Sequence, residues 1–132
     1  MDPIAELKIK IAGHSKLDFD DLPSGIRIHP PVPNGFAVEV HDDTDAWTVY
    51  LGNAGFHETF DTSEETLQFV AWCYSGEARI REVWRGRSPA KSVLEVFENG
   101  TWCITSETRF IFVPFWRRRR EMILENPNLL NP

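Results

Sequence analysis

Apolar and polar residues alternate most regularly in the middle of the chain. Residues 36–40 and 47–51 each place apolar side chains at every second position. A period of two puts one set of side chains on a single face of a β-strand. A short acidic segment separates these two runs, so the sequence predicts an antiparallel hairpin over residues 36–51. A glycine-rich turn follows, and a third short strand is expected over residues 56–60.

A helical period replaces this alternation over residues 63–75. Thr62 and Glu65 have the spacing of a capping box at the start, and Gly76 is a stop signal at the end. The apolar positions follow the i, i+3, i+4, i+7 spacing of one helix face: Leu67, Val70, Ala71 and Tyr74. The sequence therefore predicts one main amphipathic helix here.

Strand patterns return after the helix. Residues 78–84 alternate, with arginines on one face, and Asn99-Gly100 is a strong two-residue hairpin signal. This signal predicts a hairpin between strands 92–98 and 101–106, in which Phe97 faces Trp102 and Val96 faces Cys103. A helix over residues 89–99 that begins at Pro89 is the alternative. β-Branched and aromatic residues on both sides of Asn99-Gly100 favour the hairpin.

The two ends of the chain have weaker patterns. Residues 110–113 read as an apolar strand, and residues 115–125 fit either a helix or an edge strand, of which we favour the strand. Near the N-terminus, residues 4–11 alternate in part like a strand but also fit a short helix, which we favour. Residues 14–35 are rich in proline, glycine and aspartate, which predicts a loop or arm laid over the rest.

These patterns together predict an α+β fold. We expect an N-terminal arm over residues 1–35 and a single α+β domain over residues 36–132. The domain is predicted to be one antiparallel sheet of about five or six strands packed against the helix 63–75. The strands of this sheet are the hairpin 36–51 and the later segments 78–84, 92–98, 101–106 and 110–113.

Composition supports a folded, intracellular chain. Hydrophobic residues make up 42% of the 132 residues and charged residues 26%, as in ordinary globular proteins. The longest apolar run, residues 69–74, has six residues, far fewer than the roughly twenty of a membrane helix, and the N-terminus lacks the apolar block of a secretory signal, so we expect a cytoplasmic protein that does not enter the membrane. Cys73 and Cys103 have apolar neighbours, which predicts buried free thiols.

Charge is divided unevenly along the chain. Residues 1–60 carry ten acidic and four basic side chains, whereas residues 61–132 carry ten of each, so the net charge of −6 belongs to the first part. Basic residues in the second part are concentrated in two patches, 79–91 and 117–120. We expect a protein partner or self-association, in which the acidic part of one molecule meets the basic part of another.

The two basic patches are candidates for anion binding, because guanidinium groups bind phosphate and carboxylate bidentately. The candidate residues are Arg79, Arg81, Arg85, Arg87, Arg117, Arg118, Arg119 and Arg120. Trp84 and Trp116 lie beside them and are candidates for an exposed aromatic interaction surface. Nucleic acid is disfavoured as the ligand, because the acidic chain repels a polyanion unless the two patches converge.

One histidine constellation resembles an enzyme or metal site. His41, Asp43 and His57 lie in or beside neighbouring turns, so imidazole and carboxylate groups could meet at one sheet edge. No established ligand or catalytic spacing fixes this group, and we predict no catalytic residue, metal or cofactor. The sequence favours a small non-enzymatic interaction or regulatory module. A small-ligand enzyme or metal site at these three residues, and phosphate or nucleic-acid binding at the arginines, are the alternatives.

Overall fold

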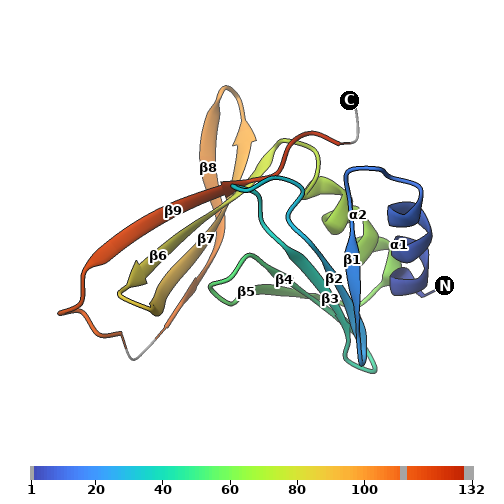
Figure 1. The fold of residues 1–132 in the computed structure, drawn as a ribbon, viewed down its shortest axis with the longest axis horizontal. Helices are drawn as coiled ribbons and strands as arrows, with labels where there is room; N and C mark the ends of the chain where they lie inside the picture. The colour runs from blue at the N-terminus through green and yellow to red at the C-terminus, as the bar shows by residue number, and fades with distance from the viewer. Residues whose placement is uncertain (1, 111–112, 130–132) are drawn as a thin grey trace.

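Nine strands form two antiparallel sheets in the computed structural model, which describes residues 2–110 and 113–129 (Figure 1). The five-stranded sheet has the order β1-β2-β3-β4-β5. The four-stranded sheet has the order β8-β7-β6-β9. The strands of the first sheet are β1 (Phe19–Leu22), β2 (Gly25–Ile28), β3 (Val38–Asp42), β4 (Trp47–Leu51) and β5 (Phe56–Phe60). Those of the second are β6 (Ala78–Arg85), β7 (Ser88–Glu98), β8 (Thr101–Arg109) and β9 (Arg119–Glu125).

Two short helices, α1 (Pro3–Ala12) and α2 (Ser63–Trp72), cover one face of the five-stranded sheet (Figure 1). The apolar positions of the alternating strands face these helices, and Val38, Val40 and Val49 are fully buried there. Helices and sheet thus share one core, because each removes the apolar face of the other from water. The polar positions of the same strands lie on the opposite face.

The prediction of α2 is confirmed, with an earlier end than expected. Thr62 Oγ1 accepts a hydrogen bond from the Glu65 backbone N–H at 3.1 Å and donates one to Glu65 Oε1 at 2.9 Å. The first bond is the N-cap half of the predicted capping box, whereas the Glu65 side chain reaches back to the hydroxyl of Thr62 and not to its backbone N–H. The helix ends at Trp72, and Gly76 then takes a φ of 84°, which allows the chain to turn into β6.

The predicted hairpins are confirmed. Strand β3 pairs with β4, β4 with β5, and β7 with β8, all antiparallel. Asn99 and Gly100 both have positive φ, as a two-residue hairpin turn requires, and Phe97 is opposite Trp102. The tail forms the edge strand β9, as favoured. The predicted strand 110–113 includes residues 111–112, which lie outside the described residues.

The prediction of one sheet is wrong, because the strands after α2 form a sheet of their own. Strand β6 pairs with β7 and β9, and not with any strand that precedes the helix. Alternation and turn residues report which strands are neighbours in the chain. They carry no information on whether two hairpins join edge to edge, which depends on long-range contacts.

The prediction of irregular structure throughout residues 14–35 is also wrong. Residues 19–28 form β1 and β2, and β2 lies inside the five-stranded sheet. The prolines that suggested a loop lie in the connections: Pro23 in the β1–β2 turn, and Pro30, Pro31 and Pro33 between β2 and β3. Proline is compatible with a strand that ends beside it, so four-residue strands fit between these positions. The N-terminal helix is confirmed as α1.

A buried carboxylate joins the two sheets. Glu82 on β6 is fully buried, and its Oε2 accepts hydrogen bonds from the backbone N–H groups of Asn53 at 2.7 Å and Ala54 at 3.0 Å. Both donors lie in the turn between β4 and β5. Gly52, with a φ of 72°, lets this turn approach, because a Cβ there would lie 2.5 Å from Glu82 Oε2.

A buried amide makes a second connection, at the end of β9. Asn126 Oδ1 accepts a hydrogen bond from the Phe36 N–H at 2.9 Å, and its Nδ2 donates to the carbonyl oxygens of Phe36 at 3.2 Å and Cys73 at 3.4 Å. One side chain therefore ties the C-terminal strand to the approach to β3 and to the end of α2. A Cβ on Gly35 would lie 2.6 Å from Asn126 Oδ1, so glycine leaves room for this contact.

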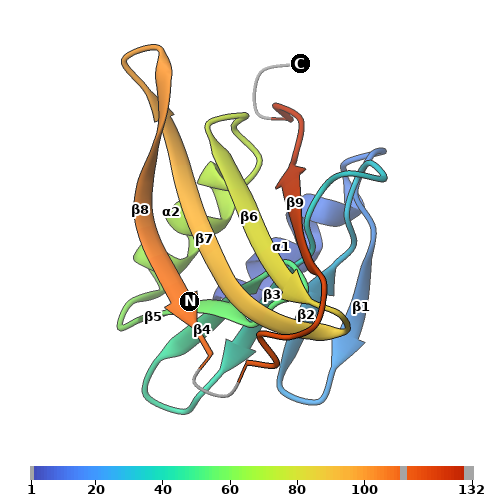
Figure 2. The same ribbon diagram turned by 90° about the vertical axis from the view of Figure 1, so that its left-hand side faces the viewer.

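The outer part of the four-stranded sheet projects as an arm, defined here as the β6–β7 hairpin end with the start of β9 (Figure 1). Figure 2 shows this sheet in front of the five-stranded sheet, with both helices behind. The arm therefore lies on the side of the five-stranded sheet that carries its polar residues. Its tip brings the β6–β7 turn close to the segment that leads into β9, because the Gly86 N–H donates to the Arg118 carbonyl oxygen at 2.9 Å.

Replacing Glu82 with alanine is expected to lower the free energy of unfolding by about 3 kcal/mol or more, because two backbone N–H groups at the sheet junction lose their acceptor. Urea denaturation followed by tryptophan fluorescence measures the change. The matched control is Glu98→Ala, which removes an exposed carboxylate from β7 and is expected to cost roughly 0.5 kcal/mol or less. Equal losses in the two variants would contradict the role assigned to Glu82.

Candidate functional site

A row of polar residues crosses the whole five-stranded sheet on the face away from the helices. Strand register places Asp20 opposite Arg27, Arg27 opposite Glu39, Glu39 opposite Tyr50, and Tyr50 opposite His57. Directly opposed residues on one face of an antiparallel sheet lie within contact distance of one another. Each strand thus contributes one side chain to a continuous polar row.

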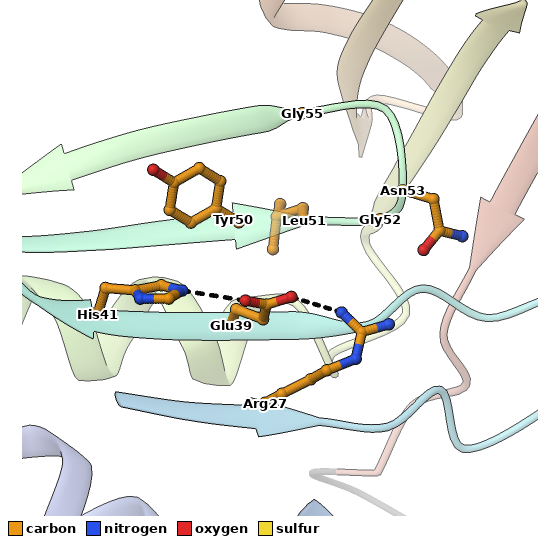
Figure 3. Close-up of a pocket in the computed structure, with 8 residues that line it drawn as sticks. All are labelled: Arg27, Glu39, His41, Tyr50, Leu51, Gly52, Asn53 and Gly55. Carbon is orange, nitrogen blue, oxygen red and sulfur yellow. Dashed lines mark hydrogen bonds and ion pairs between the residues drawn. The ribbon is translucent and has the colours of Figure 1, made fainter. Parts of the chain in front are cut away.

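Glu39 lies at the centre of this row and holds two cationic or polar neighbours. Its Oε2 is 2.5 Å from Arg27 Nη1, and its Oε1 is 3.0 Å from Nε2 of His41 (Figure 3). The ring of Tyr50 stands between two imidazoles, with centroid distances of 5.2 Å to His41 and 5.3 Å to His57. These contacts fix the orientation of the side chains relative to the sheet.

These residues border an open hollow of about 360 Å³ on the sheet face (Figure 3). Its wall is formed by the Arg27–Glu39–His41 group, Tyr50, and the β4–β5 turn with Asn53. The same turn is held from behind by Glu82, so the sheet junction also positions one side of the hollow. We call this feature the polar hollow.

The carboxyl group of Glu39 is ionised more readily than an ordinary glutamate. Partial burial acts to raise its pKa, but hydrogen bonds from His41 and Arg27 and the charge of Arg27 outweigh it, and the pKa of Glu39 is lowered. The folded state therefore favours the carboxylate. At neutral pH the polar hollow contains an Arg27–Glu39 ion pair.

The structure brings only part of the predicted histidine constellation together. His41 and His57 lie on either side of Tyr50, whereas the carboxylate of Asp43 accepts a hydrogen bond from the Thr48 hydroxyl. Within residues 2–110 and 113–129, no three His, Cys, Asp or Glu side chains are grouped so that they could hold a metal ion.

Sequence analysis missed Arg27 and Glu39, the central pair of the polar hollow. Arg27 lies in the segment predicted to be a loop, so its place on a sheet face next to Glu39 could not be read. The signal was present in the alternation Ile26, Arg27, Ile28, which has the period of a strand. Because prolines lie on both sides of this short alternation, the segment was predicted to be a loop.

The arm tip gathers cationic side chains from the two basic patches. Arg85 and Arg87 at the β6–β7 turn, together with Arg117 and Trp116 from the segment before β9, line one hollow of about 530 Å³. Gly86 has a φ of 59°, a conformation that favours glycine, and so allows the tight β6–β7 turn beside Arg117. We call this surface the arginine tip.

The eight candidate arginines divide into two groups. On the sheet face, Arg79 Nε is 2.7 Å from Glu95 Oε1, and Arg81 lies 3.8 Å from both Glu95 and Glu121. Nearer the tip, Arg119 is 3.2 Å from Glu121. Two carboxylates, Glu95 and Glu121, are thus shared by these three arginines and offset most of their positive charge.

The remaining arginines are different in this respect. In the part of the chain that the structure describes, no carboxylate lies within ion-pair distance of Arg85, Arg87, Arg117 or Arg118. Arg120 stacks over the ring of Trp84, with 5.4 Å between its Cζ atom and the ring centroid. One face of the Trp84 ring is therefore already in contact with an arginine of the arm. The positive charge available to a ligand is therefore concentrated at the tip.

Two aromatic rings are exposed beside this charge. Phe115 is 76% exposed and Trp116 72%, and the two rings meet edge to face at 5.4 Å. Large apolar side chains with this degree of exposure, grouped next to one another, are uncommon on a surface that contacts only water. Trp116 is therefore exposed, and its use as an interaction surface stays a prediction.

No protein-family model, curated protein or solved structure matches this chain. Of the helices that the structure describes, none is long and apolar enough to cross a membrane.

Cys73 is fully buried, and burial raises the pKa of its thiol, so the thiol form is favoured.

Replacing Arg27 with glutamine is expected to raise the pKa of Glu39, because the carboxylate loses an ion pair and a hydrogen bond while its partial burial remains. Carboxyl ¹³C chemical shifts followed through a pH titration measure the change.

In the wild-type protein, Glu39 contributes stability above the pKa of an unfolded glutamate, and this contribution is lost as the pH falls through the lower pKa of the folded state. A Glu39→Gln variant should therefore lose less stability on acidification than the wild type. The same acid sensitivity in both proteins would contradict this account, and Glu98→Gln is the control.

Proposed function

We propose that this protein is a non-enzymatic interaction module that binds an acidic protein surface through the arginine tip. The observation that carries the proposal is the convergence of Arg85, Arg87 and Arg117 on one hollow beside Trp116. The first two arginines and the third come from sequence patches about thirty residues apart, and the turn at Gly86 brings them together.

The state of these arginines favours binding of an external carboxylate. A guanidinium that already holds an ion pair must give it up before it binds a ligand, and the arginines of the tip have no such pair among the described residues. The groups are exposed or half-buried and present planar forks, which match carboxylates bidentately. The tip therefore offers charge at a small desolvation cost.

The neighbouring rings favour a protein as the partner. Tryptophan and arginine are the residues most enriched among those that contribute strongly to protein–protein affinity. Phe115 and Trp116 supply exposed apolar area directly beside the charges. A partner that combines carboxylates with apolar side chains would use both components of the surface.

Net charge argues against nucleic acid. The chain carries −6 overall, so a long polyanion is repelled everywhere except at the tip. An acidic patch on a protein is short enough to contact the tip alone. A second copy of the chain offers such a patch in the β3–β4 turn, where Asp42, Asp43 and Asp45 are exposed. Self-association is thus one form of the proposed interaction.

Binding of a short fluorescein-labelled peptide of alternating glutamate and tyrosine residues, followed by fluorescence anisotropy, tests the proposal. We expect binding that weakens as salt is added. Replacing Arg85, Arg87 and Arg117 together with glutamine should reduce the affinity by about tenfold, if each exposed pair contributes roughly 0.5 kcal/mol. Trp116→Ala should weaken binding further, through loss of apolar contact.

The matched control removes three positive charges elsewhere, with Lys8, Lys10 and Lys16 replaced by glutamine. It changes the net charge by the same amount and should bind almost as the wild type does. Equal losses in the two triple variants would show that only net charge matters and would overturn the arginine tip. Tighter binding of a single-stranded oligothymidylate of the same length than of the acidic peptide would overturn the acidic protein partner. Sedimentation at low and high salt separates self-association from binding of another protein.

A further inference from the structure

The polar hollow is open to solvent and is separate from the arginine tip. Tyr50 is 38% exposed, and the side chains of Arg27, Glu39 and His41 are 30%, 27% and 29% exposed. A molecule that enters the hollow therefore reaches the polar atoms of its wall. The volume of about 360 Å³ lies near the lower end of the range for small-molecule sites, about 300–1,000 Å³.

The charges in the polar hollow favour an uncharged ligand. Arg27 Nη1 lies 2.5 Å from Glu39 Oε2, and His41 Nε2 lies 3.0 Å from Glu39 Oε1. An anion would have to draw Arg27 away from this ion pair, and a cation would have to draw Glu39 away. Either ligand would lose an existing interaction for each one that it gains. A neutral ligand leaves the ion pair intact.

The same groups still have unused capacity for hydrogen bonds. A carboxylate has about four lone-pair sites and a guanidinium five N–H donors. Glu39 uses one contact on each oxygen, and Arg27 uses Nη1. Asn53 adds an exposed side-chain amide, which is both a donor and an acceptor. A hydroxyl group also donates and accepts, so a ligand with several hydroxyl groups pairs with all of these side chains.

One aromatic ring gives the polar hollow a flat apolar surface. Figure 3 looks onto the sheet and shows the ring of Tyr50 with one face toward the viewer, beside Glu39 and His41. The imidazoles of His41 and His57 flank this ring and hold its orientation. A pyranose has C–H groups on its face and hydroxyl groups around its rim, which match one ring face surrounded by polar groups. A nucleobase has two apolar faces, one of which would remain in water here.

We propose that the polar hollow binds a neutral sugar, a hexopyranose unit whose C–H face lies on the Tyr50 ring and whose hydroxyl groups bond to the surrounding polar side chains. These side chains are Arg27, Glu39 and Asn53. The ring provides affinity by removing apolar area from water. The ion pair is already held in place before the ligand binds, so its donors and acceptors are supplied at a small cost in side-chain ordering.

Titration with the methyl glycosides of glucose, galactose and mannose, followed by ¹H–¹⁵N NMR of the backbone amides, tests the proposal. We expect at least one glycoside to give saturable shifts at Tyr50 and Asn53. Tyr50→Ala should weaken its binding by about fivefold, the usual value of one aromatic contact. Tyr50→Phe keeps the ring and should bind nearly as the wild type does.

Asn53→Ala is the second variant, because it removes the exposed amide and keeps the backbone N–H that bonds to Glu82. It should weaken binding by about fivefold, the value of one ordinary hydrogen bond. Trp116→Ala is the control: it removes an exposed ring from the arginine tip and should leave glycoside binding unchanged.

The proposal is overturned if none of the three glycosides shifts these amides in the wild type. Unchanged affinity in Tyr50→Ala or in Asn53→Ala also overturns it. Tighter binding of inorganic phosphate or of glycine in the polar hollow than of every glycoside would show that a charged ligand is preferred, which likewise contradicts the proposal. None of these results bears on the arginine tip, whose variants and probe are different.

Discussion

The buried carboxylate of Glu82 is the interaction on which the arrangement of the two sheets depends. A fully buried acidic side chain is costly to desolvate, and here two backbone N–H groups of the β4–β5 turn compensate it. These bonds connect strands on opposite sides of the junction. Apolar packing brings the sheets together without specifying a direction, whereas the two N–H groups define where β6 must lie.

The polar hollow and the arginine tip both depend on this junction. The turn that Glu82 holds forms one side of the polar hollow, and the strand that carries Glu82 continues outward into the arm. Strand β9 pairs antiparallel with β6, so the segment before β9 lies at the tip, while Asn126 anchors the other end of β9 at the base of the arm. One core therefore supports chemically different surfaces in different directions.

Local features of the fold were predictable, and the long-range ones were not. The capping box at Thr62 and the turn at Asn99-Gly100 are determined by residues a few positions apart, so α2 and the β7–β8 hairpin could be read directly. The split into two sheets depends on Glu82 meeting residues of a turn 28 or 29 positions earlier. The arginines of the tip were identified by composition. Their division into paired and unpaired groups depends on the register of β7 and β9, which no local pattern contains.

Amide hydrogen exchange at Asn53 and Ala54 tests the central claim most directly. Asn53 is exposed in a turn, and a turn amide bonded only to water exchanges quickly. If Glu82 holds this turn as described, both amides will be protected to nearly the same degree as those of Val40 and Val49 in the sheet. Exchange of Asn53 and Ala54 at the rate of an open loop, with the sheet still protected, would contradict the account.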